Sequence, residues 1–260
     1  MRTDLMHGLK ALLILGALLA APGGFAAGAA GPGATDWQKW TAGNKVTDIP
    51  SLQRGAAHFV NYCSGCHSLK YVRWSRLGED LRIPEGELRK SLMPAGTKPA
   101  SYVISSMPRA DAEGWFGIVP PDLSLIVRAR SVDYVYRFLK TFYVDPAKPL
   151  TGVDNLTLPG TAMPHVLSDL EGLKLAAFRS VGGEGGAPVK QFVKFETIAP
   201  GRLNAEQYDA FVRDLVNFLD YASEPAQAAR RSLGIWVVLF LLVFTGISWF
   251  LYKEYWKDVH

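Results

Sequence analysis

Cys63, Cys66 and His67 have the residue types and the spacing that attach a haem covalently. They form the pattern Cys-x-x-Cys-His, the attachment motif of a c-type haem. On one helical turn, each thiol can add to a vinyl group of the haem. The next residue, His67, then lies under the ring and can supply an imidazole nitrogen to the iron. The motif therefore predicts a covalent haem with His67 as its proximal ligand.

Cys63 and Cys66 are the only two cysteines in the 260-residue sequence, which removes most competing explanations. A structural zinc site needs about four nitrogen or sulfur ligands, and no second cysteine pair exists. A disulfide framework needs more bridges than one three-residue loop. A redox-active dithiol is the main alternative, but that motif normally lies in a βαβ pattern and does not require the histidine.

An electron-transfer haem with six ligands needs a second axial ligand opposite His67. His58 precedes the motif on the same predicted helix, so it would have trouble reaching the far face of the ring, and we expect it to be an ordinary histidine on the helix surface. Met163 lies within the segment 159–164, where three of six residues are Pro or Gly and the backbone is expected to be rigid and extended. Sequence position favours Met163 and leaves open three others: Met93, Met107 and His165.

The choice of this ligand has a chemical consequence. A thioether sulfur favours Fe(II) more than an imidazole does, so ligation by Met163 predicts a high reduction potential. Ligation by His165 would predict a low potential, and an empty position would allow oxygen or small-molecule chemistry.

A helix must deliver the motif to the core of the protein. Apolar residues recur with a 3.6-residue period after Ser51, the expected N-cap, and the last of them is Cys63. Asn204 and Gln207 form a capping-box pattern that opens another amphipathic helix, which Pro225 should end.

Two shorter helices are predicted between these long ones. One should begin at Pro121-Asp122, and one should be capped by Ser131 and end before Pro146. The connecting stretches 145–164 and 182–188 are rich in Pro and Gly, and loops of this kind are usually functional or wrap around something. Sustained strand alternation is scarce, so we predict a mainly α domain with long irregular loops.

The N-terminus has the features of a secretory signal peptide. Arg2 and Lys10 make the start of the chain basic, an apolar run over 11–21 comes next, and small residues follow that run. We predict a signal peptide over 1–27, with cleavage somewhere in 24–30; an uncleaved anchor is the alternative. In both cases most of the chain leaves the cytoplasm, as c-type haem attachment in bacteria requires.

Residues 233–252 form a second hydrophobic segment, 20 residues long and without a charge. At about 1.5 Å per residue it spans roughly 30 Å, the thickness of the bilayer core. Trp236 and Trp249 lie near its ends, as in an aromatic belt. We predict a transmembrane helix, with a buried soluble helix as the alternative. Basic residues flank both ends equally, so the signal peptide sets the orientation: domain 31–224 outside, tail 253–260 inside.

Net charge carries little information here. The chain has 28 basic and 24 acidic residues, a formal charge of +4, and no basic cluster. We therefore expect no nucleic-acid partner.

Together, these features resemble the cytochrome c1 family, the haem c subunits of ubiquinol–cytochrome c reductase (bc1) complexes, in its bacterial form. The resemblance covers essentially the whole mature chain, including the C-terminal anchor. The matching segments are residues 63–77, 120–130 and 159–164. The Pro-Pro-Asp-Leu-Ser sequence that begins at Pro120 is far more specific than the cysteine motif, which occurs in many unrelated cytochromes.

The resemblance implies a class I c-type cytochrome-like haem domain and assigns the ligands of one haem c. Cys63 and Cys66 would form thioether bonds, and His67 and Met163 would be the axial ligands. Some bacterial relatives carry an extra disulfide, which this chain cannot form.

The resemblance also implies three further residues around the haem. Pro121 would line the pocket, Arg130 would pair with a haem propionate through its guanidinium fork, and Tyr134 would lie near the same edge. The stretch from Arg130 to Tyr134 is shorter than in mitochondrial members, which weakens the assignment of Tyr134. We expect Arg128 to lie on a solvated helix face.

The function implied is that of a mono-haem electron carrier, not an enzyme by itself, in the bacterial inner membrane with its haem domain in the periplasm. It would take electrons from a Rieske iron–sulfur protein and pass them to a soluble cytochrome c, beside a cytochrome b subunit and membrane lipid. Two other hypotheses stay open: another anchored c-type cytochrome, such as a quinol dehydrogenase or oxidase subunit, and an exported thiol–disulfide protein.

Overall fold

The fold was analysed in a computed structural model that describes residues 36–182 and 188–258. The predicted signal peptide, 1–27, lies outside the described residues, as do the last two residues of the tail. Nine α-helices cover about half of the described chain, in agreement with the mainly α prediction.

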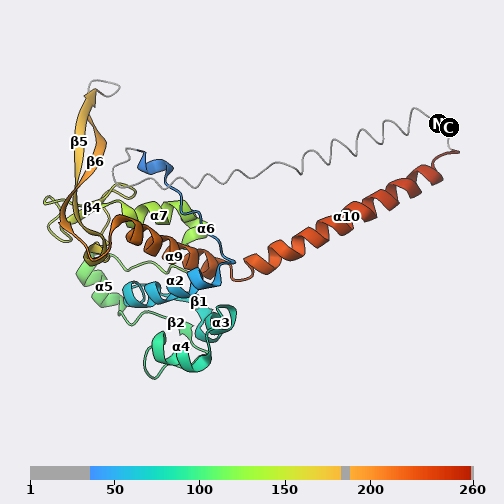
Figure 1. Cartoon of the computed structure of the whole chain (residues 1–260), viewed down its shortest axis with the longest axis horizontal. Coiled ribbons are helices and arrows are strands. Elements are labelled where there is room, and N and C mark those ends of the chain that lie inside the picture. Colours follow the sequence, from blue (N-terminus) through green and yellow to red (C-terminus); the bar gives the residue numbers. More distant parts are fainter. Residues whose placement is uncertain (1–35, 183–187, 259–260) are drawn as a thin grey trace.

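Helix α9 (Ala205–Ser223) forms the centre of the domain, between α2 (Ile49–Tyr62) on one side and α6 (Ile126–Arg130) with α7 (Val132–Lys140) on the other (Figure 1). Its apolar side chains are buried along most of its length, and Val212, Leu215, Val216 and Phe218 have no exposed surface. The haem motif follows directly from α2, so the packing of α2 on α9 determines where the motif lies.

The start of α2 differs from the prediction. Asp48, not Ser51, is the N-cap, because its side chain accepts a hydrogen bond from the Ser51 amide at 3.2 Å and Pro50 fits the first turn. The hydroxyl of Ser51 instead donates to Asp214 of α9 at 2.6 Å. Ser51 is therefore part of the contact between the two helices.

The other two predicted caps are confirmed. Ser131 accepts from the amide of Tyr134 at the start of α7. Asn204 and Gln207 form the reciprocal capping box of α9, which ends at Ser223 ahead of Pro225.

The helix predicted at Pro121-Asp122 begins later, at Ile126. The Asp122 carboxylate accepts hydrogen bonds from the amides of Ser124 at 3.0 Å and Lys70 at 2.9 Å. These contacts hold residues 121–124 in a turn against the segment that follows the motif, so the helix cannot begin there.

Short elements complete the domain around this helical core. These short elements are η1 (Trp37–Lys39), β1 (Leu69–Arg73), α3 (Trp74–Asp80), α4 (Glu85–Ser91), β2 (Tyr102–Val103), α5 (Arg109–Phe116), β3 (Phe142–Val144), β4 (Val153–Asn155) and α8 (Ser168–Glu171). Strand β1 pairs antiparallel with β2, and β3 pairs antiparallel with β4.

The sequence prediction missed a long antiparallel ribbon. Strands β5 (Gly172–Gly182) and β6 (Pro188–Pro200) pair along their whole length and project away from the helices (Figure 1). Of the Gly-rich stretch 182–188 predicted as a loop, residues 183–187 lie outside the described residues. Two register shifts interrupt the ribbon, and much of both faces is exposed, so its sequence lacks the regular alternation of a half-buried strand.

Helix α10 (Gln227–Tyr255) contains the predicted membrane segment 233–252. By length and composition it can cross a membrane, with a mean hydropathy of 2.3 over its most apolar window and none of that window buried. Figure 1 shows it extending away from the domain, and none of its most apolar window is buried by the described residues.

Candidate functional site

The motif lies on a single turn at the end of α2. The amides of Cys66 and His67 donate to the Cys63 carbonyl at 3.1 and 2.8 Å, which continues the helix by one turn. Both cysteines have free thiols. The structure therefore brings two thiols and an imidazole together on one turn, as the spacing predicts, with Cys63 buried and Cys66 partly exposed.

The imidazole of His67 is oriented by a hydrogen bond to the Pro121 carbonyl, 2.7 Å from Nδ1. A carbonyl oxygen only accepts, so Nδ1 carries the proton and donates. This tautomer leaves the lone pair of Nε2 available to a metal ion. Burial lowers the pKa of His67, although the Pro121 contact and the charge of Asp122 oppose the shift, and the neutral, ligating form is favoured.

Backbone contacts fix the Pro121 carbonyl in this position. The Leu123 amide donates to the Ser68 carbonyl at 2.9 Å, and the Lys70 amide donates to the Asp122 carboxylate at 2.9 Å. The two residues that follow Pro121 are thus tied to the segment that follows His67. This explains why the Pro-Pro-Asp-Leu-Ser sequence accompanies the motif.

The two thiols lack the electrostatics of a redox-active pair. Burial raises the pKa of Cys63 to about 12, and burial also raises the pKa of Cys66. Thiol–disulfide proteins react through a thiolate, whose pKa is lowered by a positive environment. The raised pKa values of the two thiols are the reverse of what the dithiol alternative needs.

A cavity of about 290 Å³ lies beside the motif, with Cys66, Met107 and Pro120 in its wall. Ile104, which also lines this cavity, is 58% exposed, and Trp115 and Ile118 on the following segment are 57% and 59% exposed. A flat apolar group such as a haem fits this combination of two free thiols, an imidazole with Nε2 available to a metal ion, and exposed apolar surface.

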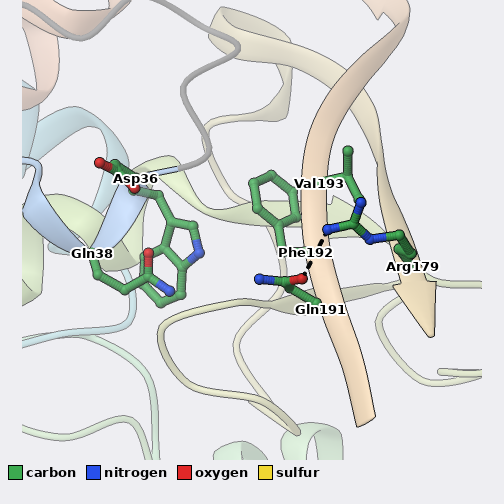
Figure 2. Close-up of a pocket in the computed structure, with 7 residues that line it drawn as sticks. Asp36, Gln38, Arg179, Gln191, Phe192 and Val193 are labelled. Atoms are coloured by element: carbon green, nitrogen blue, oxygen red, sulfur yellow. Dashed lines mark hydrogen bonds between the residues drawn. The ribbon is translucent and has the colours of Figure 1, made fainter. Parts of the chain in front are cut away.

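A larger cavity, about 510 Å³, lies between η1 and the β5–β6 ribbon (Figure 2). Its walls include Trp37, Arg179 and Phe192, and it contains none of the predicted site residues. The larger of these two cavities is therefore not the candidate haem site.

The candidates for the second axial position differ in their surroundings, and Met107 is the one that lines the cavity beside the motif. Met93 is buried in the apolar core. His58 is half-buried and stacks on Phe211, with ring centroids 3.9 Å apart, so the expectation of an ordinary surface histidine is wrong. His165 directs its Nε2 to the Glu171 carboxylate at 2.9 Å. That nitrogen is already bonded and is not free for a metal.

Met163 is partly buried on a tightly bonded segment. Its amide contacts the Thr161 hydroxyl at 3.3 Å, and the Gly160 amide donates to the Asp154 carboxylate at 2.6 Å. Gly160 has φ of +80°, a conformation that favours glycine. The Pro-rich segment is therefore tied to Asp154, and the turn at residues 159–160 departs from the extended backbone that the sequence predicted.

Arg130 and Tyr134 lie together where α6 meets α7, with the guanidinium 5.6 Å from the ring centroid. Arg130 has no ion pair among the described residues, so its charge is available to an anion such as a propionate. Arg128 is exposed as predicted, but it also pairs with Glu224 at 2.6 Å, directly before the membrane helix.

Ser105 supports the motif and was not predicted. Its hydroxyl donates to the Gly65 carbonyl at 2.7 Å, and its amide donates to the Ser68 hydroxyl at 2.8 Å. The partners are about 40 residues away in the sequence, so no local pattern could have indicated the contact.

Comparison with known proteins gives a consistent family. The model of the cytochrome C1 family matches residues 39–99 and 203–259. Cytochrome c1 of Allochromatium vinosum is 47% identical over 83% of this chain and 87% of its own length. The ammonia monooxygenase gamma subunit of Nitrosomonas europaea is 42% identical over 82% of this chain and 85% of its own length. Cytochrome c1 of Rhodospirillum rubrum is 29% identical over 96% of this chain and 97% of its own length.

Proposed function

The chain belongs to the cytochrome c1 family, and from this premise we propose that it is a membrane-anchored electron carrier with one haem c. Proteins of this family carry covalently bound haem c and are electron-transfer subunits of the bc1 complex. We propose that this chain takes electrons from a Rieske iron–sulfur protein and passes them to a soluble cytochrome c. Quinol chemistry would belong to a cytochrome b subunit beside it.

The observation that carries the proposal is the hydrogen bond from His67 to the Pro121 carbonyl, 2.7 Å long. It holds the imidazole in the tautomer that presents Nε2, and it increases the basicity of that nitrogen. Cys63 and Cys66, on the same turn, would hold the haem through thioether bonds. When bound, the haem supplies a one-electron Fe(III)/Fe(II) couple.

Three other residues would tune this couple. Met163 would be the second axial ligand, and its thioether would raise the potential. Arg130 would pair with a propionate, with Tyr134 at the same edge, and so reduce the negative charge next to the iron. Residues 31–224 would form a class I c-type cytochrome-like domain around the haem.

Helix α10 would anchor this domain in the bacterial inner membrane. The domain would lie in the periplasm, and residues 253–260 in the cytoplasm. A bilayer is the expected environment of α10, because its apolar surface has no partner within the described chain. The single anchor would keep the carrier next to its membrane partners while the domain exchanges electrons with soluble ones.

The test is purification of the full chain in mild detergent through a tag on the C-terminal tail, followed by redox titration of the visible spectrum. Co-purified b-type haem together with a high-potential c haem is the expected result. A lone c haem at low potential would refute the bc1 assignment and favour another anchored cytochrome. Recovery with a monooxygenase assembly, as the name of the Nitrosomonas relative suggests for that protein, would also refute it.

A further inference from the structure

We propose that His165 is a positioning residue that holds Met163 at the haem iron through its contact with Glu171. The proposal rests on the proposed role of Met163 as axial ligand. His165 would not contact the iron. It would limit how often the methionine leaves it.

The side chain of His165 is fixed on two sides. Only 6% of it is exposed, and its ring stacks in parallel on Phe142, with centroids 4.9 Å apart and an interplanar angle of 5°. Its Nε2 lies 2.9 Å from the Glu171 carboxylate. Because a carboxylate only accepts, Nε2 carries the proton and donates.

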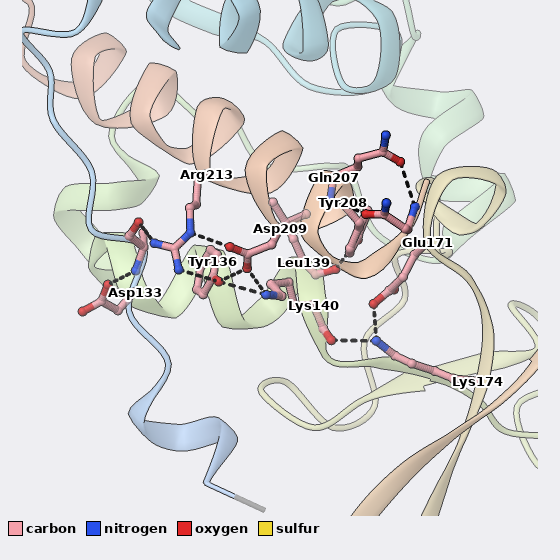
Figure 3. A network of polar contacts seen from close by, with 12 residues as sticks. Asp133, Tyr136, Leu139, Lys140, Glu171, Lys174, Gln207, Tyr208, Asp209 and Arg213 are labelled. Atoms are coloured by element: carbon pink, nitrogen blue, oxygen red, sulfur yellow. Dashed lines mark hydrogen bonds and ion pairs between the residues drawn. The ribbon is translucent and has the colours of Figure 1, made fainter. Parts of the chain in front are cut away.

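Glu171 is itself attached to the body of the domain. Its carboxylate pairs with Lys174 of β5, which donates to the Lys140 carbonyl of α7 at 2.8 Å (Figure 3). Both charged side chains are 12% exposed, and burial of this kind strengthens a charge-assisted hydrogen bond. The anchor thus joins the segment after Met163 to the base of β5 and to the end of α7.

The segment before Met163 has an anchor of its own. Asn155, which is fully buried, donates to the Phe138 carbonyl at 2.7 Å and accepts from the Thr157 amide at 2.8 Å. Met163 therefore lies on a short bridge between two fixed points. His165 is the nearer one, separated from Met163 only by Pro164, whose ring restricts the backbone.

Loss of the His165 contact should increase the fraction of molecules in which Met163 is off the iron. An added ligand such as imidazole binds only that fraction, so its apparent affinity rises in proportion to it. A tenfold larger open fraction gives a tenfold lower apparent Kd. The expected change is about tenfold, which corresponds to about 1.4 kcal/mol.

The experiment uses the full-length holoprotein in detergent and titrates it with imidazole in the Fe(III) form. His165→Phe keeps the stack on Phe142 and removes the hydrogen bond; we expect tighter imidazole binding and a weaker red charge-transfer band of the sulfur–Fe(III) bond. His165→Gln keeps a donor to Glu171 and should restore much of the wild-type behaviour. If His165→Phe does not assemble, Glu171→Gln weakens the same contact from its other side.

His58→Phe is the matched control, because His58 also stacks on a phenylalanine but is not part of the Met163 segment. It should leave imidazole affinity unchanged. An unchanged affinity in His165→Phe, or an equal change in His58→Phe, would overturn the positioning role. Met163→Leu tests the ligand role of Met163 separately from the positioning role of His165: if this variant retains the charge-transfer band, the ligand assignment itself is wrong.

Discussion

Replacing Gly55 with alanine should force α2 away from α9 and destabilise the part of the domain that presents the haem motif. Gly55 faces α9 at the closest approach of the two helices. A Cβ atom at this position would lie 2.1 Å from the Asp214 carbonyl oxygen and 2.6 Å from the Phe218 Cβ. The first contact is with backbone, which cannot rotate away as a flexible side chain could.

The magnitude follows from this geometry. Relief of the clash needs a shift of about 1 Å, and such a gap forfeits a quarter to a half of the dispersion energy of the contacts that it opens. Overpacking of a core costs about 1–3 kcal/mol, and a backbone clash belongs at the upper end. Alanine recovers about 1 kcal/mol of helix propensity. The expected net loss is therefore about 2 kcal/mol.

The assay is urea unfolding of the holoprotein, followed by the visible spectrum and by circular dichroism. Gly114→Ala is the matched control, since Gly114 is also inside a helix, α5, and nothing lies within 4 Å of its Cβ position. The control should be stabilised by about 0.5–1 kcal/mol. Equal or greater stability of Gly55→Ala would refute the close packing of α2 on α9.

Three further predictions concern the site and its surroundings. Met163→Leu should lower the midpoint potential by more than about 59 mV, a tenfold change for one electron, and leave haem attachment intact; an unchanged potential would remove Met163 from the ligand role. Burial lowers the pKa of His58, so the unfolded chain binds its proton more tightly, and stability should fall as the pH drops below about 6.5. His58→Phe should flatten that part of the pH profile in urea titrations, and an unchanged profile would contradict this linkage. Asn155→Ala should cost about 2–3 kcal/mol in denaturant unfolding, because the Thr141 hydroxyl and the Thr157 and Leu158 amides lose their acceptor; a loss below about 0.5 kcal/mol would count against the buried network.

Local patterns in the sequence determined much of the chemistry and several helix ends. The Cys63–His67 motif is complete within one helical turn, so its spacing alone predicts how its side chains group. The caps at Ser131 and Asn204 are also short-range, because each side chain bonds an amide three residues away. The apolar run in α10 identifies a membrane-length helix by composition and length. The role of Met163 needed the family resemblance as well.

Tertiary structure alone decided how these parts are held. The partner of His67 is a carbonyl 54 residues away, and sequence analysis placed Pro121 only as a pocket residue. The N-cap of α2 and the β5–β6 ribbon were missed, and so was the contact between His165 and Glu171. Ser51 was predicted to cap α2, but its hydroxyl bonds Asp214 of α9, a partner that only the packing of the two helices supplies. The ribbon was missed because its register shifts and exposed faces remove the regular alternation of a strand. Sequence periodicity records which side of an element is apolar, but the partner of a polar atom is set by which distant segment arrives beside it.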